Sequence, residues 1–480
     1  MIEWGISAGT HDASITVVDG ETNEILFASH SERFGRREKN DGHLNYQILE
    51  EAKKFGKPKV IYWYEHPILK FGRKLYSGEP DKWFSPKQYL KKWGITGVPI
   101  KWGIHHKTHA AAGYYTSPFD EAAVLVIDAI GEFNTTTIWK AKDKLKKVYT
   151  RNYPNSLGLF YSAMTHRIGL KPNEDEYILM GMAAYGDPDK FYNRIKTELI
   201  DSGISHHKGV MGWCPGLKEE NYFDVAAATQ KIYEELYIEL LQLTKEKTGS
   251  DNLVLMGGCA LNCLANRHAS DYFKNIWIMP NPGDAGSSLG AIAAYKECKL
   301  QWKTPYLGYN IKGKYPVTKL LNELMENRMV GIANGRAEFG PRALGNRSLL
   351  ADPRGKEMKD LVNSIKKRQE FRPFAPVILE ADVHKYFDVP KGFKSPYMQY
   401  VVRCRDTESY PAIVHKDGTS RVQTVSAKDH RGLYNLLKKW KEVTGCPMLL
   451  NTSLNIKGQP IVNTKKDAEE FEKKYGVRCF

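Results

Sequence analysis

Two histidines and two aspartates have the residue types and spacing of a metal site. His105 and His109 stand four positions apart in an alanine-rich segment, so on a helix both imidazoles project from one face and can share an ion. Asp128 ends an apolar run and Asp284 lies in a glycine turn, and their carboxylates could complete the set. Such nitrogen and oxygen donors suit Fe, Mn or Zn. The histidine spacing alone is a weak signal, so two structural histidines are the alternative.

A second pair that could do chemistry is His11 and Asp12, in a turn rich in glycine and small polar residues. A neutral imidazole could accept the proton of an attacking hydroxyl, and the carboxylate could orient the ring. The alternative is an aspartate that caps the turn beside an exposed histidine. No G-x-S-x-G, Walker A or Rossmann fingerprint occurs, which disfavours a serine nucleophile or hydride transfer.

Two cationic clusters near the C-terminus predict an anion site. Residues 338–354 interleave arginines with glycines, and guanidinium groups together with closely approaching backbone N–H groups bind phosphate. A second cluster over residues 366–372 follows at once, so a polyanionic small molecule is favoured over a single ion. The alternative is a solvated basic face. The cationic and glycine residues of the first cluster are Arg342, Arg347, Arg354, Gly340 and Gly345.

Residues 53–102 have a different texture, in which lysine and arginine alternate with many aromatic residues. Basic side chains neutralise phosphates and aromatic rings stack on bases, so this segment could contact a nucleotide or nucleic acid. A solvated subdomain with a buried aromatic core is the more common outcome of such a pattern. Nucleic-acid contact is therefore the less frequent of the two outcomes that this segment allows.

Length and composition describe an ordinary globular protein. A chain of 480 residues is too long for one core and predicts two or three domains. Most of the formal net charge of +15 falls in residues 301–480, which indicates phosphate-bearing ligands there. The seven cysteines form no CxxC pair, which disfavours a disulfide framework or a zinc knuckle. No apolar run is long enough to cross a membrane, and no signal peptide is evident, so we expect a cytoplasmic protein.

The candidate residues lie on a pattern that recurs. Residues 4–20 and 123–139 each read as an apolar strand, a turn with aspartate and glycine, and a second strand. A further strand at 253–256 runs into Gly257 and Gly258, a turn that could face a nucleotide. Duplicated hairpins of this kind predict an actin-like nucleotide fold. Residues 301–315 are rich in glycine and proline and read as a linker, which predicts domains at 1–305 and 316–480.

A set of short motifs, collinear over nearly the whole chain, resembles the O-carbamoyltransferases of nodulation-factor and antibiotic biosynthesis, the type that acts on tobramycin or hydroxymethylcephem. The motifs are His11-Asp12, Ser31-Glu-Arg-Phe34, HHxxHAA at 105–111, IDxxGE at 127–132, Ser156-Leu-Gly-Leu-Phe-Tyr161, Met180-Gly-Met-Ala183, GGCALN at 257–262, GDAGSSLG at 283–290, GPRALGNRS at 340–348, FRPFAP at 371–376, the segment 415–425 and Asn451-Thr-Ser-Leu-Asn455.

The resemblance implies an α/β enzyme of two domains. The N-terminal one would be a duplicated actin-like (ASKHA) domain similar to the tRNA threonylcarbamoyl transferase, and the C-terminal one an α/β YrdC-like domain similar to threonylcarbamoyl-AMP synthase. The C-terminal domain would make carbamoyl-adenylate from carbamoyl phosphate and ATP, with Mg²⁺ accompanying the ATP. The N-terminal domain would hold that adenylate on a divalent metal, Fe(II) in the family, and pass the carbamoyl group to an acceptor hydroxyl.

The resemblance also implies roles for individual residues. Its metal ligands are His105, His109, Asp128 and Asp284, with His11 as the base and Asp12 beside it. Its nucleotide or carbamoyl-adenylate contacts are Glu132, Gly257, Gly258 and Asn262. Its carbamoyl phosphate and ATP contacts are Arg342, Arg347, Ser348, Lys366, Arg368, Arg372, His415, Arg421, Asn451 and Ser453. The chain departs from the family pattern at Ile178, Gln369, Leu454 and Gln459.

For the acceptor we favour a 5-hydroxymethylpyrimidine, in DNA or as a nucleotide, because the chain is basic and carries the aromatic and cationic segment 53–102. A sugar or antibiotic hydroxyl is the alternative acceptor. From other classes, tRNA-modifying carbamoyl transfer and a non-catalytic nucleotide-dependent binding protein remain open. The expected partners are thus small molecules, with DNA or a nucleotide as acceptor, no membrane, and a homodimer as the expected assembly.

Overall fold

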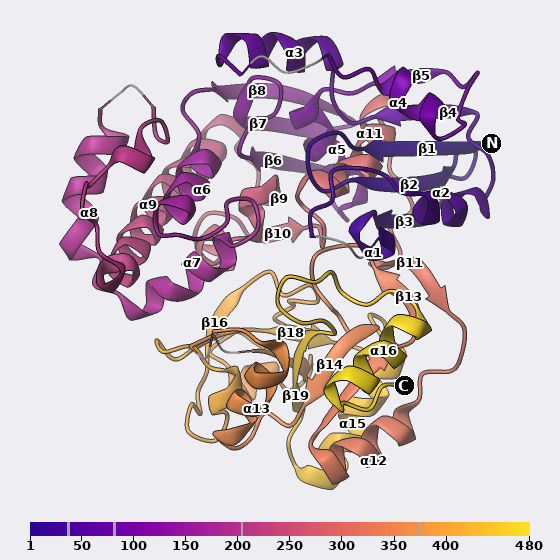
Figure 1. The fold of residues 1–480 in the computed structure, drawn as a ribbon, viewed down its shortest axis with the longest axis vertical. Coiled ribbons are helices and arrows are strands. Elements are labelled where there is room, and N and C mark those ends of the chain that lie inside the picture. Colours follow the sequence, from indigo (N-terminus) through magenta and orange to yellow (C-terminus); the bar gives the residue numbers. More distant parts are fainter. Residues whose placement is uncertain (36–38, 80–82, 203–204, 370, 373) are drawn as a thin grey trace. The chain divides into compact units, whose positions relative to one another are not determined.

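The computed structural model describes residues 1–35, 39–79, 83–202, 205–369, 371–372 and 374–480. Within them the chain forms two compact units (Figure 1). The first unit comprises Met1–Ser31 and Asn40–Lys303, and the second comprises Glu32–Lys39 and Thr304–Phe480. The segment Glu32–Lys39 belongs to the second unit although it lies far from the rest of that unit in sequence, which a boundary drawn from linker composition does not foresee.

The first unit contains two five-stranded sheets, ordered β3-β2-β1-β4-β5 and β8-β7-β6-β9-β10. In each, the first strand along the chain pairs antiparallel with the second and parallel with the fourth, which pairs parallel with the fifth. The strands are β1 (Ile2–Ser7), β2 (Ser14–Asp19), β3 (Ile25–His30), β4 (Val60–Trp63), β5 (Ile100–Trp102), β6 (Glu121–Ile127), β7 (Asn134–Lys142), β8 (Lys144–Asn152), β9 (Asn252–Met256) and β10 (Asn275–Ile278).

The two sheets therefore have the same connectivity, which confirms the duplicated actin-like fold predicted from the repeated strand and turn pattern. The central strand of each sheet is almost wholly buried. A strand between two neighbours, covered on both faces, needs such a continuous apolar run. The turn that follows β1 carries the pair His11 and Asp12, and the turn that follows β6 carries Asp128 and Glu132, which the sequence analysis assigned to the metal and to the nucleotide.

Two helices, α5 (His105–Thr116) and α11 (Ser287–Lys296), pack against each other and against these sheets. Small residues make this close packing possible. A Cβ atom on Gly290 would lie 2.0 Å from the backbone oxygen of Thr108, so no larger residue fits at this crossing. The alanine-rich stretch after His109 is buried in the same contact. Small residues therefore let α5 pack directly against α11, and this contact positions both histidines.

The remaining helices of the first unit lie on its surface or form a separate group beside the second sheet. In that group α9, the longest helix, packs against α6, α7 and α8 (Figure 1). The helices are α2 (Tyr46–Lys53), α3 (Pro67–Tyr76), α4 (Pro86–Lys92), α6 (Leu157–Arg167), α7 (Glu176–Met182), α8 (Asp189–Ile195), α9 (Tyr222–Thr248) and α10 (Cys263–Asn266). Among the described residues, no helix combines the length and apolar character needed to span a lipid bilayer.

The second unit is also α/β and agrees with the predicted YrdC-like class. Its main sheet has the order β12-β14-β19-β15-β18, and two further strand pairs, β11-β13 and β16-β17, accompany it. The strands are β11 (Tyr306–Ile311), β12 (Met329–Ala333), β13 (Gly335–Glu338), β14 (Arg347–Ala351), β15 (Ala375–Leu379), β16 (Val401–Arg403), β17 (Thr419–Arg421), β18 (Gln423–Val425) and β19 (Met448–Ser453). The helices are α1 (Glu32–Gly35), α12 (Val317–Asn327), α13 (Glu357–Lys366), α14 (Val383–Tyr386), α15 (Arg431–Thr444) and α16 (Lys465–Tyr475).

Two details of the second unit differ from the sequence analysis. Residues 301–315 are not a bare linker, because they contain β11, which pairs with β13. The helix α1 contributes a buried side chain from far upstream: Arg33 Nη2 donates to the backbone oxygen of Gly340 at 2.9 Å. The ring of Phe34 packs edge-on against that of Tyr309. These contacts explain why the segment containing α1 belongs to this unit.

Candidate metal centre and anion-binding cluster

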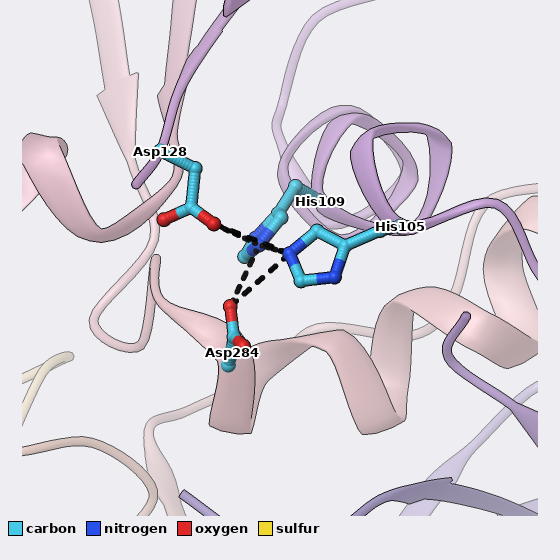
Figure 2. Close-up of side chains that lie close together, drawn as sticks. All are labelled: His105, His109, Asp128 and Asp284. Atoms are coloured by element: carbon cyan, nitrogen blue, oxygen red, sulfur yellow. Dashed lines mark hydrogen bonds and ion pairs between the residues drawn. The ribbon is translucent and has the colours of Figure 1, made fainter. Parts of the chain in front are cut away.

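The four predicted metal ligands lie together in the first unit, and all are buried (Figure 2). One donor atom from each of His105, His109, Asp128 and Asp284 lies within 4.8 Å of the other three. His105 Nε2 is 3.2 Å from Asp128 Oδ2 and 3.3 Å from Asp284 Oδ1. His109 Nε2 is 3.1 Å from the same Asp284 oxygen and 3.1 Å from His105 Nε2. Two imidazoles and two carboxylates that turn their donor atoms toward one point are typical of a site for a divalent metal ion.

Three elements bring these side chains together. The helix α5 begins at His105 and presents His109 one turn later on the same face. Asp128 directly follows β6, the central strand of the second sheet. Asp284 opens the short 3-10 turn Asp284–Gly286, which leads into α11. Because α5 and α11 pack against each other, the aspartate at the start of one helix faces the histidines at the start of the other.

Neighbouring groups orient the ligands toward that point. His109 Nδ1 lies 3.1 Å from the backbone oxygen of Pro282, and since a carbonyl can only accept, Nδ1 carries the proton and Nε2 is left as a ligand atom. The backbone N–H of Gly258 donates to Asp128 Oδ1 at 2.9 Å, which leaves Oδ2 to face the histidines. The four side chains are thus held in a geometry that suits a metal ion.

The electrostatics of the cluster also suit a cation. Burial opposes ionisation of Asp128 and Asp284, yet the neighbouring histidines hold the pKa of both carboxyl groups below the usual value. Burial likewise opposes protonation of His105, but the aspartates, Asp284 foremost, raise its pKa well above the usual value. Two buried carboxylates therefore share one small space and attract positive charge. The residues present fit a divalent metal ion, which these carboxylates would neutralise.

His11 and Asp12 lie at the edge of this cluster. His11 Nδ1 is 3.0 Å from Asp12 Oδ2, and its Nε2 is 3.7 Å from Asp284 Oδ2. Burial lowers the pKa of His11, but the hydrogen bond to Asp12 and the charge of Asp284 outweigh it and raise that pKa to about 9. A general base must be neutral, so the predicted role of His11 requires that a cation neutralise Asp284.

Glu132, for which nucleotide contact stays a prediction, hydrogen-bonds the backbone at the start of α5. Its Oε1 accepts the backbone N–H of His66 at 2.8 Å and that of His105 at 3.1 Å, and its Oε2 is also 3.1 Å from the His105 nitrogen. The residue before α5, Ile104, offers no capping side chain. The carboxylate of Glu132 therefore caps the helix that carries both histidines and complements its positive end.

The glycine turn after β9 serves the local backbone. Gly257 has φ +90°, and a Cβ atom there would lie 2.1 Å from the backbone oxygen of Ile127, so only glycine fits. The side chain of Asn262 caps α10 by accepting from the backbone N–H of Ala265 at 3.1 Å. Its amide also exchanges hydrogen bonds with that of Gln230. Nucleotide contact by Gly257, Gly258 and Asn262 stays a prediction.

In the second unit the structure corrects the predicted role of Arg347. This side chain is fully buried. All its donors go to backbone oxygens at 2.8–3.2 Å, which leaves none for a phosphate. The acceptors are the backbone oxygens of Asn463, Asn334, Asn346, Tyr309 and Gly335. Burial lowers the pKa of Arg347 to about 10. Arg347 therefore holds loops together rather than binding carbamoyl phosphate.

The backbone around Gly345 also differs from the predicted phosphate cradle. The Oε1 atom of Glu338 accepts the N–H groups of Leu344, Asn346 and Arg347 at 2.8, 2.9 and 3.2 Å. The N–H of Gly345 donates to Ser348 Oγ at 3.0 Å. The chain's own carboxylate thus occupies the donors that residue types alone assigned to an anion, and Ser348 serves the same loop.

The second cationic cluster retains the character of an anion site. Lys366, at the end of α13, is buried, and its Nζ contacts Ser453 Oγ at 3.2 Å and Asn455 Oδ1 at 2.5 Å. These partners carry no net charge. Burial, with Arg368 and other cations nearby, holds the pKa of Lys366 well below its usual value. A buried lysine beside further cations is suited to an anionic ligand. The sequence analysis named Asn455 within a motif but did not place it among the phosphate contacts, although the spacing Ser453-x-Asn455 could have indicated it.

The other residues of the second unit that were predicted to contact carbamoyl phosphate or ATP differ in burial and in hydrogen bonding. Buried polar atoms with no hydrogen-bond partner among the described residues include Asn451 Oδ1 and Arg421 Nε, and such atoms are candidates for ligand contact. Arg368 packs over the ring of Phe374, 3.7 Å from the ring centroid. His415 Nδ1 faces the backbone oxygen of Thr419 at 2.9 Å, and burial lowers its pKa. Arg342 lies half-buried between β13 and β14, and Arg372 lies half-buried after α13.

Comparison with known proteins decides the family. The models described as Carbamoyltransferase N-terminus and Carbamoyltransferase C-terminus match residues 81–293 and 321–480. Nodulation protein NolO of Bradyrhizobium diazoefficiens is 34% identical over 76% of this chain and 75% of its own length. The chain belongs to the carbamoyltransferase family. A protein of Synechocystis sp. whose function is not characterised is 32% identical over 99% of this carbamoyltransferase and 93% of its own length.

Among solved structures, full-length HypF in its phosphate- and nucleotide-bound form is similar over 62% of this carbamoyltransferase and 46% of HypF, with 15% identity and a TM-score of 0.36. The family assignment confirms the resemblance drawn from the motifs, so the protein is an O-carbamoyltransferase. The match to the N-terminal model contains all four metal-site residues, and the match to the C-terminal model contains Lys366 and Ser453. His11 and Asp12 precede both matched ranges.

Proposed function

We propose that this carbamoyltransferase works in two steps at two sites. In the second unit, carbamoyl phosphate, ATP with Mg²⁺ and water give carbamoyl-adenylate, phosphate and pyrophosphate. In the first unit, the oxygen of an acceptor alcohol attacks the carbamoyl carbon, the bond to AMP breaks, and the alcohol proton leaves to a base. The observation that carries this proposal is the convergence of His105, His109, Asp128 and Asp284 within 4.8 Å.

For the transfer step, these four side chains would hold a divalent metal ion, for which we propose Fe(II). When bound, the ion would supply Lewis-acid polarisation and neutralise charge on the departing adenylate. His11 has Nδ1 held by Asp12 at 3.0 Å, so its Nε2 is the atom placed to accept the proton of the acceptor hydroxyl. Because AMP is a good leaving group, the remaining task of the site is to position the two reactants.

For the adenylate-forming step we assign Lys366, Arg368, Ser453 and Asn455 to the phosphate groups. The ammonium of Lys366 is buried between Ser453 and Asn455, and Arg368 lies close enough to depress its pKa. An anion placed there would pair with the buried Lys366 ammonium, whose partners Ser453 and Asn455 carry no charge, and this favours binding. Arg421 and Asn451, each with a buried polar atom lacking a partner among the described residues, are the proposed neighbours of this anion.

Separate assays of the two steps test the scheme. Pyrophosphate release from ATP with carbamoyl phosphate reports adenylate formation, and carbamoylation of an acceptor reports transfer. Asp128→Ala should abolish transfer and retain pyrophosphate release, because Asp128 belongs to the first unit only. Lys366→Ala should abolish both, and transfer should return when carbamoyl-adenylate is supplied. Equal loss of both steps in Asp128→Ala, with the protein folded, contradicts the division.

For the acceptor we propose a 5-hydroxymethylpyrimidine, in DNA or as a nucleotide. The aromatic segment 53–102 turned out to be mixed: Trp63 and Tyr64 are core residues, whereas Tyr76 is 69% exposed. The ring of Tyr76 lies 6.3 Å from that of Tyr153, over which the ammonium of Lys208 sits at 5.2 Å. An exposed ring beside a half-buried ring and a cation suits a planar base that carries a phosphate.

Mass spectrometry tests this acceptor. The protein is incubated with ATP and carbamoyl phosphate and offered a hydroxymethylated oligonucleotide, a hydroxymethylated nucleotide or an aminoglycoside sugar. Addition of one carbamoyl group to the oligonucleotide or nucleotide supports the pyrimidine. Addition to the sugar alone favours a sugar or antibiotic hydroxyl and leaves the two-step scheme intact. ATP and carbamoyl phosphate are cytoplasmic metabolites, so we propose the cytoplasm as the compartment of the reaction.

A further inference from the structure

The second ring nitrogen of His105 differs from that of His109. The Nδ1 atom of His109 faces the backbone oxygen of Pro282, whereas Nδ1 of His105 is buried and has no hydrogen-bond partner among the described residues. A carboxylate oxygen, Glu65 Oε2, lies 4.0 Å from this nitrogen. A metal-binding histidine nearly always donates its other N–H to a carboxylate or a carbonyl. Glu65 lies where such an acceptor is required.

Glu65 is itself held from the opposite side. It follows β4 by two residues, and its side chain is 5% exposed. Its Oε1 accepts from Lys70 Nζ on α3 at 2.5 Å, and that lysine is also largely buried. A buried carboxylate with one oxygen on a lysine keeps its charge and its direction. The pairing leaves Oε2 as the oxygen that faces His105.

The residues on either side of Glu65 are tied to the same helix end. The N–H of His66 and the N–H of His105 both donate to the Glu132 carboxylate. The ring of Tyr64 packs against that of His105, with centroids 5.4 Å apart. The segment 64–66 therefore has a fixed position relative to the first residue of α5. A small turn of the Glu65 carboxylate or of the imidazole closes the gap of about 1 Å to hydrogen-bond distance.

We propose that Glu65 is a positioning residue of the metal centre, which accepts a hydrogen bond from Nδ1–H of His105 and is itself oriented by Lys70. This inference rests on the metal ion of the proposed function. The hydrogen bond fixes the tautomer in which Nε2 is the ligand atom and makes the imidazole a stronger donor. The two histidines would then be supported by different acceptors, a backbone carbonyl for His109 and a charged side chain for His105.

Metal affinity tests the proposal without reference to activity. The probe is Co²⁺ titrated into the metal-depleted full chain in competition with a chelator, with the visible absorption of the bound ion as readout. The variant Glu65→Leu with Lys70→Met removes the acceptor and leaves no unpaired charge. It should bind Co²⁺ about 10–100-fold more weakly, the usual cost of losing such a partner. The matched control is Glu50→Gln, whose carboxylate pairs with Lys53 on the surface, and its affinity should equal that of the unaltered chain.

A second readout separates positioning from simple packing. In the Zn²⁺-loaded protein labelled with ¹⁵N-histidine, Nδ1–H of His105 should give an exchange-protected resonance. Glu65→Gln changes shape least and keeps a neutral acceptor, so this resonance should persist but shift, and Co²⁺ affinity should fall by less than in the double variant. If the double variant fails to fold, Glu65→Gln alone decides: an unmoved resonance with unchanged affinity overturns the proposal.

The outcomes also distinguish this inference from the proposed function. If the unaltered chain binds no divalent ion, the metal centre itself fails. If it binds Co²⁺ and the folded double variant binds it within twofold as well, only the role of Glu65 fails. Weaker binding in the double variant, with thermal unfolding of the metal-depleted protein unchanged, supports the role.

Discussion

The metal centre of the first unit and the arginine-glycine segment of the second unit both carry residue types that bind ligands, yet their atoms are used differently. At the metal centre, Nε2 of His105 and Nε2 of His109 point at each other and at carboxylates, 3.1–3.3 Å apart. In the segment, every N–H group of Arg347 already meets a backbone oxygen. Ligand atoms that converge on one point indicate a binding site. N–H groups that all have protein acceptors indicate a structural role.

The largest effect should come from Arg347, the saturated residue. Arg347→Met keeps much of the volume but removes every one of these hydrogen bonds, so several buried carbonyl groups lose their partners. We expect the free energy of unfolding of the protein to fall by about 3–5 kcal/mol, or the second unit not to fold. Thermal and urea unfolding measure this. A folded variant of normal stability that fails only to bind ATP would contradict the structural role.

The converging site should respond in the opposite way. Asp284→Asn removes a charge from the ligand set and should weaken Co²⁺ binding by more than about 100-fold, beyond the usual cost of an outer partner. Because Asp284 and the neighbouring histidines stabilise each other's charges in the metal-depleted protein, we also expect a loss of stability, smaller than that of Arg347→Met. Chelator competition and thermal unfolding check the two parts. Normal Co²⁺ binding by this variant would contradict the role of Asp284 as a metal ligand.

Lys366 gives a second comparison, within the second unit. It is buried like Arg347, but among the described residues its ammonium contacts only Ser453 and Asn455, whereas Arg347 contacts five backbone oxygens. Lys366→Met should slow pyrophosphate release by about 10²-fold or more, the scale of losing one charged contact to a transferring phosphate. It should not destabilise the fold, since an apolar side chain of similar length replaces a buried cation. The same assay and unfolding measurement apply. A strong loss of stability would place Lys366 with Arg347 as a structural residue.

The smallest effect should come from Glu132, which caps α5. Glu132→Gln keeps an acceptor but loses the charge at the helix N-terminus, so we expect a stability loss of about 1 kcal/mol and a Co²⁺ affinity reduced a few-fold. The KM for ATP should not change. An increased KM with unchanged stability would instead restore the nucleotide contact that the sequence had suggested.

Much of the fold followed from local patterns. The repeated strand and turn at 4–20 and 123–139 appears as two sheets of identical connectivity, because buried central strands need continuous apolar runs. The four-residue spacing of His105 and His109 predicted that both rings share one face of a helix, but the spacing alone was a weak signal for a metal site. Asp128 and Asp284 were added because one ends an apolar run and the other lies in a glycine turn, and the motif resemblance implied the same set; the packing of α5 against α11 that brings them together is visible only in the fold.

The roles of other residues could not be predicted from the sequence, because they depend on which N–H groups already have an acceptor within the folded protein. Arg342 and Arg347 look alike in sequence, but Arg347 is fully buried among five backbone oxygens, whereas Arg342 is half-buried. Glu338 gives no sign that its carboxylate fills the backbone donors of the following loop. Glu65 belongs to no motif, because its partners lie five and forty positions away.

The path of the chain between Ser31 and Asn40 has a practical consequence for anyone who wishes to divide the enzyme. The backbone oxygens of Asn40 and Asp41 accept the N–H groups of Asp12 and Ala13. The residues that hydrogen-bond the His11 turn therefore come directly after Glu32–Lys39, the segment that belongs to the second unit. A single cut after Lys303 would leave Arg33 on the wrong fragment, away from the Gly340 oxygen that it binds. A single cut therefore does not separate the two units, and a swap of C-terminal halves between relatives should exchange residues 32–39 together with them.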